Sequence, residues 1–141
     1  MEFRVSVVRR PGYLHVQVWG DNSLETVRKY IREIRQAVLH YDCPAVLIEE
    51  NLQGPGLSLG EMYEVVREES LDRSRMIRLI VLVDVNPDHN PEDMRFVETA
   101  AMNRAMNFHV FPTVADAETW IRRELAPPAS QDSAAARAAR A

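Results

Sequence analysis

The sequence predicts an α/β fold, in which a single mixed, mostly parallel sheet is opened by a β-hairpin and covered by about four helices. Strand-like and helix-like segments alternate along the chain in the order β-β-α-β-α-β-α-β-α, which is typical of a small α/β sandwich. Two capped helices in the last third, 90–105 and 113–125, flank a short strand at 108–111. Connections of this length favour parallel later strands, with functional loops at their carboxyl ends.

The amino-terminal part predicts a hairpin followed by an amphipathic helix. Residues 3–8 and 13–19 alternate in residue type, and the turn-forming segment 9–12 separates them. Residues 21–23 offer three candidate N-caps for the helix that follows. The outer face of this helix is basic, and its apolar residues recur at helical spacing, so it should pack on the sheet. These apolar positions are Leu24, Val27, Ile31, Ile34 and Val38.

Two continuous apolar runs predict strands that are buried on both faces. The first, residues 45–48, is followed by the carboxylates Glu49 and Glu50. The second, residues 77–83, leads into the polar loop 84–89. We therefore expect polar side chains to gather where these two strands end.

A glycine-rich loop and a helix start lie between these two strands. Residues 53–56, Gln-Gly-Pro-Gly, predict a flexible loop. Ser58 and Glu61 then form the S-x-x-E pattern of a capping box, and the helix that they start carries apolar residues on one face and glutamates on the other. The loop and the first turns of this helix therefore form a candidate contact surface.

The composition limits the class of protein. With 141 residues, 46% of them apolar and 27% charged, the chain fits one domain, expected at 1–125. Residues 126–141 are rich in Ala and contain Pro but lack large apolar side chains, so we expect a disordered tail. The net charge of -4 and the interspersed charges argue against a nucleic-acid partner. No apolar run reaches the roughly 20 residues of a spanning helix, so we expect a cytoplasmic protein without membrane insertion.

No group of residues has the spacing of a catalytic or metal site. Glu49, Asp84 and His89 have side chains suited to a cation and lie near strand ends that could converge, but they match no ligand motif. We expect no catalytic residue, no metal and no cofactor, and we treat these three as the candidate rim of a pocket, with a solvated surface as the alternative. Glu49 stands out, because a carboxylate that continues a buried strand must reach solvent or find an unusual environment.

The remaining reactive and bulky side chains have ordinary structural explanations. Cys43 is the single cysteine, so an internal disulfide is excluded. It could act as a nucleophile beside His40 or Asp42, but a partly buried connector before Pro44 is the interpretation we favour. The methionine and aromatic residues could line a groove or a ligand cavity, although packing in the core is their usual role.

The element order and several short segments resemble a known domain family. The segments are Gly20-Asp21 before the basic helix, Phe96-Val97-Glu98, Asn103-Arg104, Val110-Phe111 and Asp-Ala-Glu-Thr-Trp-Ile at 116–121. Together they resemble the STAS domain, and more narrowly its SpoIIAA-like branch, which includes anti-sigma-factor antagonists. The resemblance covers about residues 1–125 and implies a bacterial regulatory module that binds a protein partner and is not an enzyme.

The resemblance also implies a place for the regulatory site. In such antagonists a partner kinase phosphorylates a serine at the start of the second helix, which switches off binding. Ser58 takes this place, in a candidate partner loop with Gly54, Gly56 and Leu57, although the Asp-Ser-Ser core of that motif is absent. Ser58 also has a sufficient role as a helix cap, worth about 1 kcal/mol. A small-molecule or lipid-binding domain of the same fold is the alternative function, and a homodimer through an exposed helix face or edge strand is compatible with the sequence.

Overall fold

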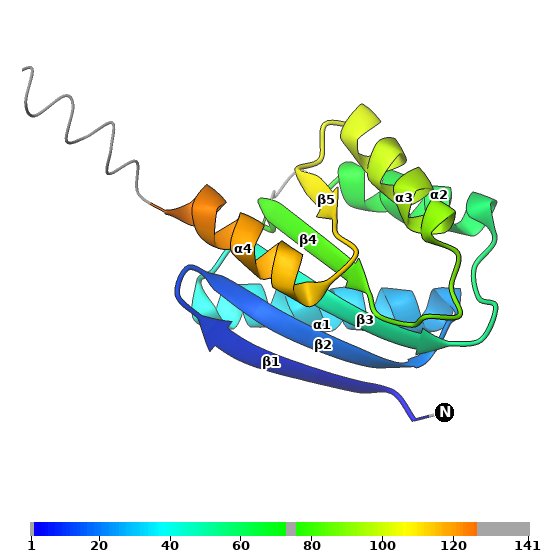
Figure 1. Ribbon diagram of the computed structural model, residues 1–141, viewed down its shortest axis with the longest axis horizontal. Helices are drawn as coiled ribbons and strands as arrows, with labels where there is room; N and C mark the ends of the chain where they lie inside the picture. The colour runs from blue at the N-terminus through cyan, green and yellow to red at the C-terminus, as the bar shows by residue number, and fades with distance from the viewer. Residues whose placement is uncertain (1, 73–75, 127–141) are drawn as a thin grey trace, which may run out of the picture.

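The computed structural model describes residues 2–72 and 76–126, which form a five-stranded sheet covered by helices (Figure 1). The strands lie in the order β1-β2-β3-β4-β5, so neighbours in the sheet are also neighbours in the chain. The pair β1 and β2 is an antiparallel hairpin, and the other three pairs are parallel. The predicted element order and the mixed, mostly parallel sheet are confirmed. The strands are β1 (Arg4–Arg10), β2 (Tyr13–Asp21), β3 (Ala45–Gln53), β4 (Leu79–Asp84) and β5 (Phe108–Val110).

The helices divide unequally between the two faces of the sheet. The first three connect neighbouring parallel strands and pack on one face, as crossovers of the same hand require. Among the described helices, only the last packs on the other face, and in Figure 1 it passes in front of the sheet while the first helix runs behind it. The helices are α1 (Leu24–Tyr41), α2 (Leu59–Ser70), α3 (Pro91–Asn103) and α4 (Val114–Leu125).

The hairpin is longer than the sequence pattern predicts. Arg9 and Arg10 were expected in the turn, but they pair with Leu14 and Tyr13, so β1 continues to Arg10. The turn that joins β1 to β2 can be this tight because Gly12 adopts φ +86°, a left-handed conformation that glycine tolerates. The strand pairing therefore extends almost to the tip of the hairpin.

The third strand is also longer than predicted, and this difference bears on function. The apolar run ends at residue 48, but β3 continues to Gln53, because its backbone pairs with β2 as far as Asp21. The carboxylates Glu49 and Glu50 therefore lie within a strand and point to opposite faces of the sheet. Glu50 shares its face with Val46 and Ile48, which both belong to the core beneath the first three helices.

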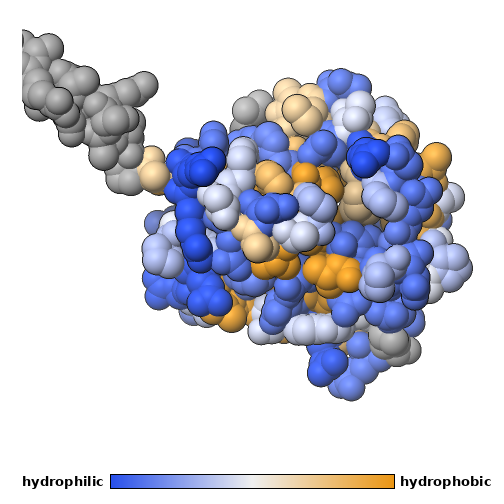
Figure 2. All heavy atoms as spheres, in the orientation of Figure 1, coloured by the Kyte–Doolittle hydropathy of each residue, from blue (hydrophilic) through white to orange (hydrophobic). Residues whose placement is uncertain are grey.

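Two apolar cores lie on the two faces of the sheet. The larger joins the sheet to α1, α2 and α3, and the smaller joins it to α4 through side chains such as Leu47, Val81 and Ile121. The face that carries α4 is mostly hydrophilic at its surface, with hydrophobic side chains showing near its middle (Figure 2). Most apolar residues of this face are therefore hidden beneath the helix.

Two further expectations concern the carboxyl-terminal tail and the membrane. The proposed tail lies almost wholly outside the described residues, and the domain boundary at residue 125 stays a prediction. Within the described part of the chain, no helix has the length and apolar character needed to cross a membrane.

Candidate functional site

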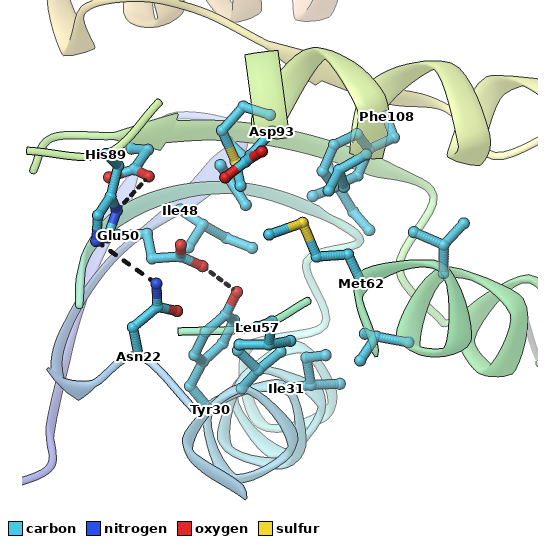
Figure 3. Close-up of a pocket in the computed structure, with 18 of the residues that line it drawn as sticks. Asn22, Tyr30, Ile31, Ile48, Glu50, Leu57, Met62, His89, Asp93 and Phe108 are labelled. Atoms are coloured by element: carbon cyan, nitrogen blue, oxygen red, sulfur yellow. Dashed lines mark hydrogen bonds and ion pairs between the residues drawn. The ribbon is translucent and has the colours of Figure 1, made fainter. Parts of the chain in front are cut away.

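A cavity of about 540 Å³ lies between the sheet and helices α1, α2 and α3. A volume of this size is in the usual range for small-molecule sites. Its walls are mostly apolar and come from both layers, with Ile48 and Leu82 from the sheet, Ile31 from α1, Met62 from α2 and Phe108 from β5. Figure 3 shows the side chains of Ile31, Ile48, Met62 and Phe108 around the space. The first three helices therefore hold part of the larger core open instead of filling it.

Polar side chains gather at the end of the cavity where β3 and β4 finish. Glu50 and Asp84 are partners in the parallel register of these two strands, so they lie side by side and face the same layer. The loop after β4 adds Asp88 and His89, and the first turn of α3 adds Asp93. The cavity thus has a long apolar part and one polar, acidic end.

Glu50 is the buried acid of this site. It is only 6% exposed, and the Tyr30 hydroxyl of α1 donates a hydrogen bond of 2.5 Å to its Oε2 atom (Figure 3). Burial raises the pKa of Glu50 to about 7; the charge of Asp84 acts in the same direction, whereas the Tyr30 hydrogen bond and His89 oppose it. Burial also raises the pKa of the Tyr30 hydroxyl well above its usual range, so Tyr30 remains a donor.

Asp84 and His89 form a polar network that ties two loops together. The Nδ1 atom of His89 lies 2.7 Å from Oδ2 of Asp84, and its Nε2 atom lies 3.2 Å from the carbonyl oxygen of Gly54. Asn86 donates from its side chain to the Leu52 carbonyl at 2.7 Å, and its backbone N–H donates to Asp84. The loop after β4 therefore supports the loop that joins β3 to α2.

The candidate partner loop forms part of the cavity wall. Gly54, Pro55 and Leu57 line the cavity, and Asn22 before α1 donates to the Gly54 carbonyl at 3.4 Å. Gly56 has φ +73°, and a Cβ atom added to it would lie 2.0 Å from the Asn22 side chain. The close approach and the left-handed backbone both require glycine at this position. A ligand in the cavity would therefore contact this loop directly.

The structure brings together two of the three residues predicted at a pocket rim. Asp84 and His89 both line the cavity, but Glu49 does not, because alternation along β3 turns it to the face that carries α4. There Gln17 donates to the Glu49 carboxylate, and Nε2 of His15 lies 3.8 Å from it. The expectation that Glu49 lies at the pocket is therefore wrong, and its neighbour Glu50 takes that place.

Ser58 caps α2 as its sequence pattern predicts. Its Oγ atom accepts from the Glu61 backbone N–H at 3.1 Å, and the Glu61 side chain accepts from the Ser58 backbone N–H at 2.9 Å. Both halves of the capping box are thus present. Whether Ser58 is also a phosphoacceptor stays a prediction.

The capping box has a measurable contribution to stability. We expect Ser58→Ala to lower the free energy of unfolding by about 1 kcal/mol, because the Glu61 backbone N–H loses its acceptor. Chemical denaturation measures this loss, and Ser58→Thr should restore most of it. An unchanged midpoint in Ser58→Ala would show that the cap contributes little in solution.

Other reactive side chains remain apart from the cavity. The Cys43 thiol lies 3.6 Å from the Gly12 carbonyl oxygen and 3.7 Å from that of Ala45, as suits a connector between α1 and β3. His40 instead packs its ring against Tyr41. In the described ranges 2–72 and 76–126, no three His, Cys, Asp or Glu side chains are arranged to hold a metal ion.

Sequence reasoning did not identify Tyr30 and Asp93 as site residues. A signal existed for Tyr30, because it lies three residues after Val27 and so on the inner face of α1. Asp93 looked like an ordinary first-turn acid, and its sequence position satisfies the helix dipole. Only the packing of α3 over the sheet shows that it also faces the cavity.

Comparison with known proteins supports the fold and leaves the activity open. No protein-family model and no curated protein sequence matches the chain. Among solved structures, an anti-sigma factor antagonist from Mycobacterium paratuberculosis aligns with a TM-score of 0.51 and 18% identity, over 86% of this chain and 95% of that one. An uncharacterized protein with a SpoIIAA-like fold from Shewanella loihica aligns with a TM-score of 0.51 and 15% identity, over 84% and 92%. The fold of this chain is therefore that of the SpoIIAA-like, STAS-type domains.

Proposed function

We propose that this chain is a cytoplasmic, non-enzymatic regulatory module that acts by binding a protein partner, as an anti-sigma-factor antagonist does. The fold likeness to such an antagonist supports this proposal. The observation that carries it is an apolar surface at the start of α2. Leu59 is 50% exposed and Tyr63 is 41% exposed, and their spacing of four residues places them on one side of the helix.

The contact surface that we propose consists of residues 51–56 and the amino-terminal half of α2. Ser58 lies between the loop and the exposed Leu59, so a phosphate on Ser58 would add negative charge at the centre of this surface. The nearby Glu61 and Glu64 would oppose that charge, and a phosphate beside the exposed Leu59 would weaken an apolar contact there. A homodimer through the same surface or through the edge strand β1 stays a prediction.

We expect Leu59→Lys to reduce partner binding at least tenfold without unfolding the protein, because the exposed apolar side chain is replaced by a charge. Tagged wild type and variant would be purified from the native host, and co-purifying proteins and Ser58 phosphorylation quantified by mass spectrometry. Binding of the enriched protein would then be measured with purified components.

Two further variants make this test specific. Ser58→Asp should weaken the same interaction, whereas Arg122→Ala on the exposed side of α4 should leave it unchanged, because its ion pair with Glu118 is at the surface. A partner that binds wild type, Leu59→Lys and Ser58→Asp equally well would exclude this surface as the contact.

The cavity favours a second candidate function, a small-molecule-binding domain. A ligand that binds the native state alone at one hundred times its Kd should stabilise the protein by about 2.7 kcal/mol. Thermal-shift screening measures this effect. The control is Val66→Phe, which places a larger side chain into the cavity wall and should abolish the shift. Equal shifts in the two proteins would place the ligand elsewhere.

A further inference from the structure

The charges around the cavity are strongly asymmetric. At the end where β3 and β4 finish, its described lining includes the carboxyl groups of Glu50, Asp84, Asp88 and Asp93, with His89 as the one basic side chain. Neither lysine nor arginine is found among the described residues that line the cavity. His89 is already paired with Asp84 at 2.7 Å. The polar end therefore has an excess of negative charge that the described side chains do not balance.

Two of these acids are placed to receive a ligand. Asp93 receives no hydrogen bond or ion pair to its carboxylate from a side chain within 2–72 or 76–126, and Figure 3 shows this carboxylate turned into the space. Glu50 points into the same space from strand β3 of the sheet. The Tyr30 hydroxyl donates a hydrogen bond to its carboxyl group. The two carboxyl groups therefore approach the cavity from opposite layers of the fold.

Helix amino-termini near this end would ordinarily favour an anion, but here they are already satisfied. The backbone N–H of Glu92 donates to the Asn90 side chain at 3.0 Å, and α2 has its complete capping box with Ser58. Glu92 and Asp93 add negative charge to the first turn of α3. The remaining electrostatic preference at this end is for a cation.

We propose that the cavity binds a small ligand with an apolar body and a protonated amine as its head group, and that the amine sits between Glu50 and Asp93. This inference rests on the second candidate function above and adds the class of ligand. The apolar walls bury the body, and the acidic end supplies charge-assisted hydrogen bonds to the ammonium group. A fatty acid with an apolar chain as long as that of the amine would place its negative carboxylate against these negative side chains. The repulsion between the like charges would weaken its binding.

The binding of such a ligand should depend on pH. The pKa of Glu50 is raised to about 7, mainly by burial, so near neutral pH the carboxyl is only partly ionised. An alkylamine keeps its proton in this range, so it binds the ionised form of Glu50 more tightly than the neutral form. The groups that act on Glu50 from the elements around it are Tyr30 of α1, Asp84 of β4 and His89 of the loop after β4. We therefore expect the affinity for the amine to rise about tenfold between pH 6 and pH 8.

Three probes of equal length test the proposal: octylamine, 1-octanol and octanoate. Each would be titrated into the whole isotope-labelled chain at pH 7.5, with binding followed by NMR chemical-shift changes. Octylamine should bind at least tenfold more tightly than octanol, and octanoate most weakly. Asp93→Asn should lower the affinity for octylamine about tenfold and leave octanol unaffected, whereas Asp116→Asn at the start of α4 should change neither.

The outcomes separate the head group from the cavity itself. Octanoate binding as tightly as octylamine, or full octylamine affinity in Asp93→Asn, would overturn the amine assignment while leaving small-molecule binding in place. If none of the three probes binds, both the amine assignment and the second candidate function are wrong. A preference for octylamine that disappears in Asp93→Asn and weakens at pH 6 supports the proposal.

Discussion

Replacing Glu50 by glutamine should stabilise the protein at pH 8 and flatten its stability profile between pH 5 and pH 8. The pKa of Glu50 is raised from 4.5 to about 7, mainly by burial. Between pH 4.5 and pH 7 the native state therefore keeps a proton on Glu50 that the unfolded state has lost. Stability from Glu50 is therefore fully present below pH 4.5 and is lost as the pH rises through 7. The full loss amounts to about 3 kcal/mol. Glutamine keeps an acceptor for Tyr30 and has no charge to bury.

Urea denaturation at several pH values between 4.5 and 8.5 measures this effect. Glu50→Gln should match the wild type at low pH and exceed it by up to about 3 kcal/mol at high pH. The control is Glu49→Gln, which makes the same change one residue earlier on the opposite face of the sheet and should keep the pH slope that Glu50 produces. An unaltered slope in Glu50→Gln would mean that another group is responsible.

Truncating a core leucine should cost more on the α4 face than on the cavity face. Leu47 is fully buried against α4 and does not line the cavity, and Leu47→Ala should destabilise the protein by about 4 kcal/mol. Leu82 is nearly as buried but borders the existing cavity, so fewer contacts are lost when its side chain is shortened. We expect about 2 kcal/mol for Leu82→Ala.

The two variants are matched in chemistry, and both side chains lie in central strands. Chemical denaturation of each, without added ligand, gives the two free energies of unfolding directly. Equal losses would indicate that α2 and α3 close over the cavity in solution. A larger loss for Leu82→Ala would reverse the inferred difference in packing between the two faces.

The order of elements could be predicted from the sequence because it depends on local signals. Caps such as Ser58 and Asn90 start helices in the structure where their patterns indicate, and the apolar runs mark the strands. The lengths of β1 and β3 could not be predicted in this way. They depend on pairing with β2, which holds Arg10 and Glu50 in strands against their own preferences.

The polar end of the cavity was predictable only in part, for a geometric reason. Asp84 and His89 follow one strand directly, so their proximity could be expected from the chain itself. The choice between Glu49 and Glu50 could not, because the preceding run is apolar at every position and gives no alternation to show which side chains face α1. The partner that identifies Glu50 is Tyr30, which lies 20 residues earlier in a different layer.

The lone position of α4 has a consequence for how the protein is made. Because strand order follows chain order, a chain leaving the ribosome can assemble the sheet with α1, α2 and α3 before α4 has emerged. Until then this face of the sheet would expose apolar side chains to water, among them Leu47, Val81 and Val83. Docking of α4, the last described helix, therefore covers this apolar face and completes the fold of the new chain.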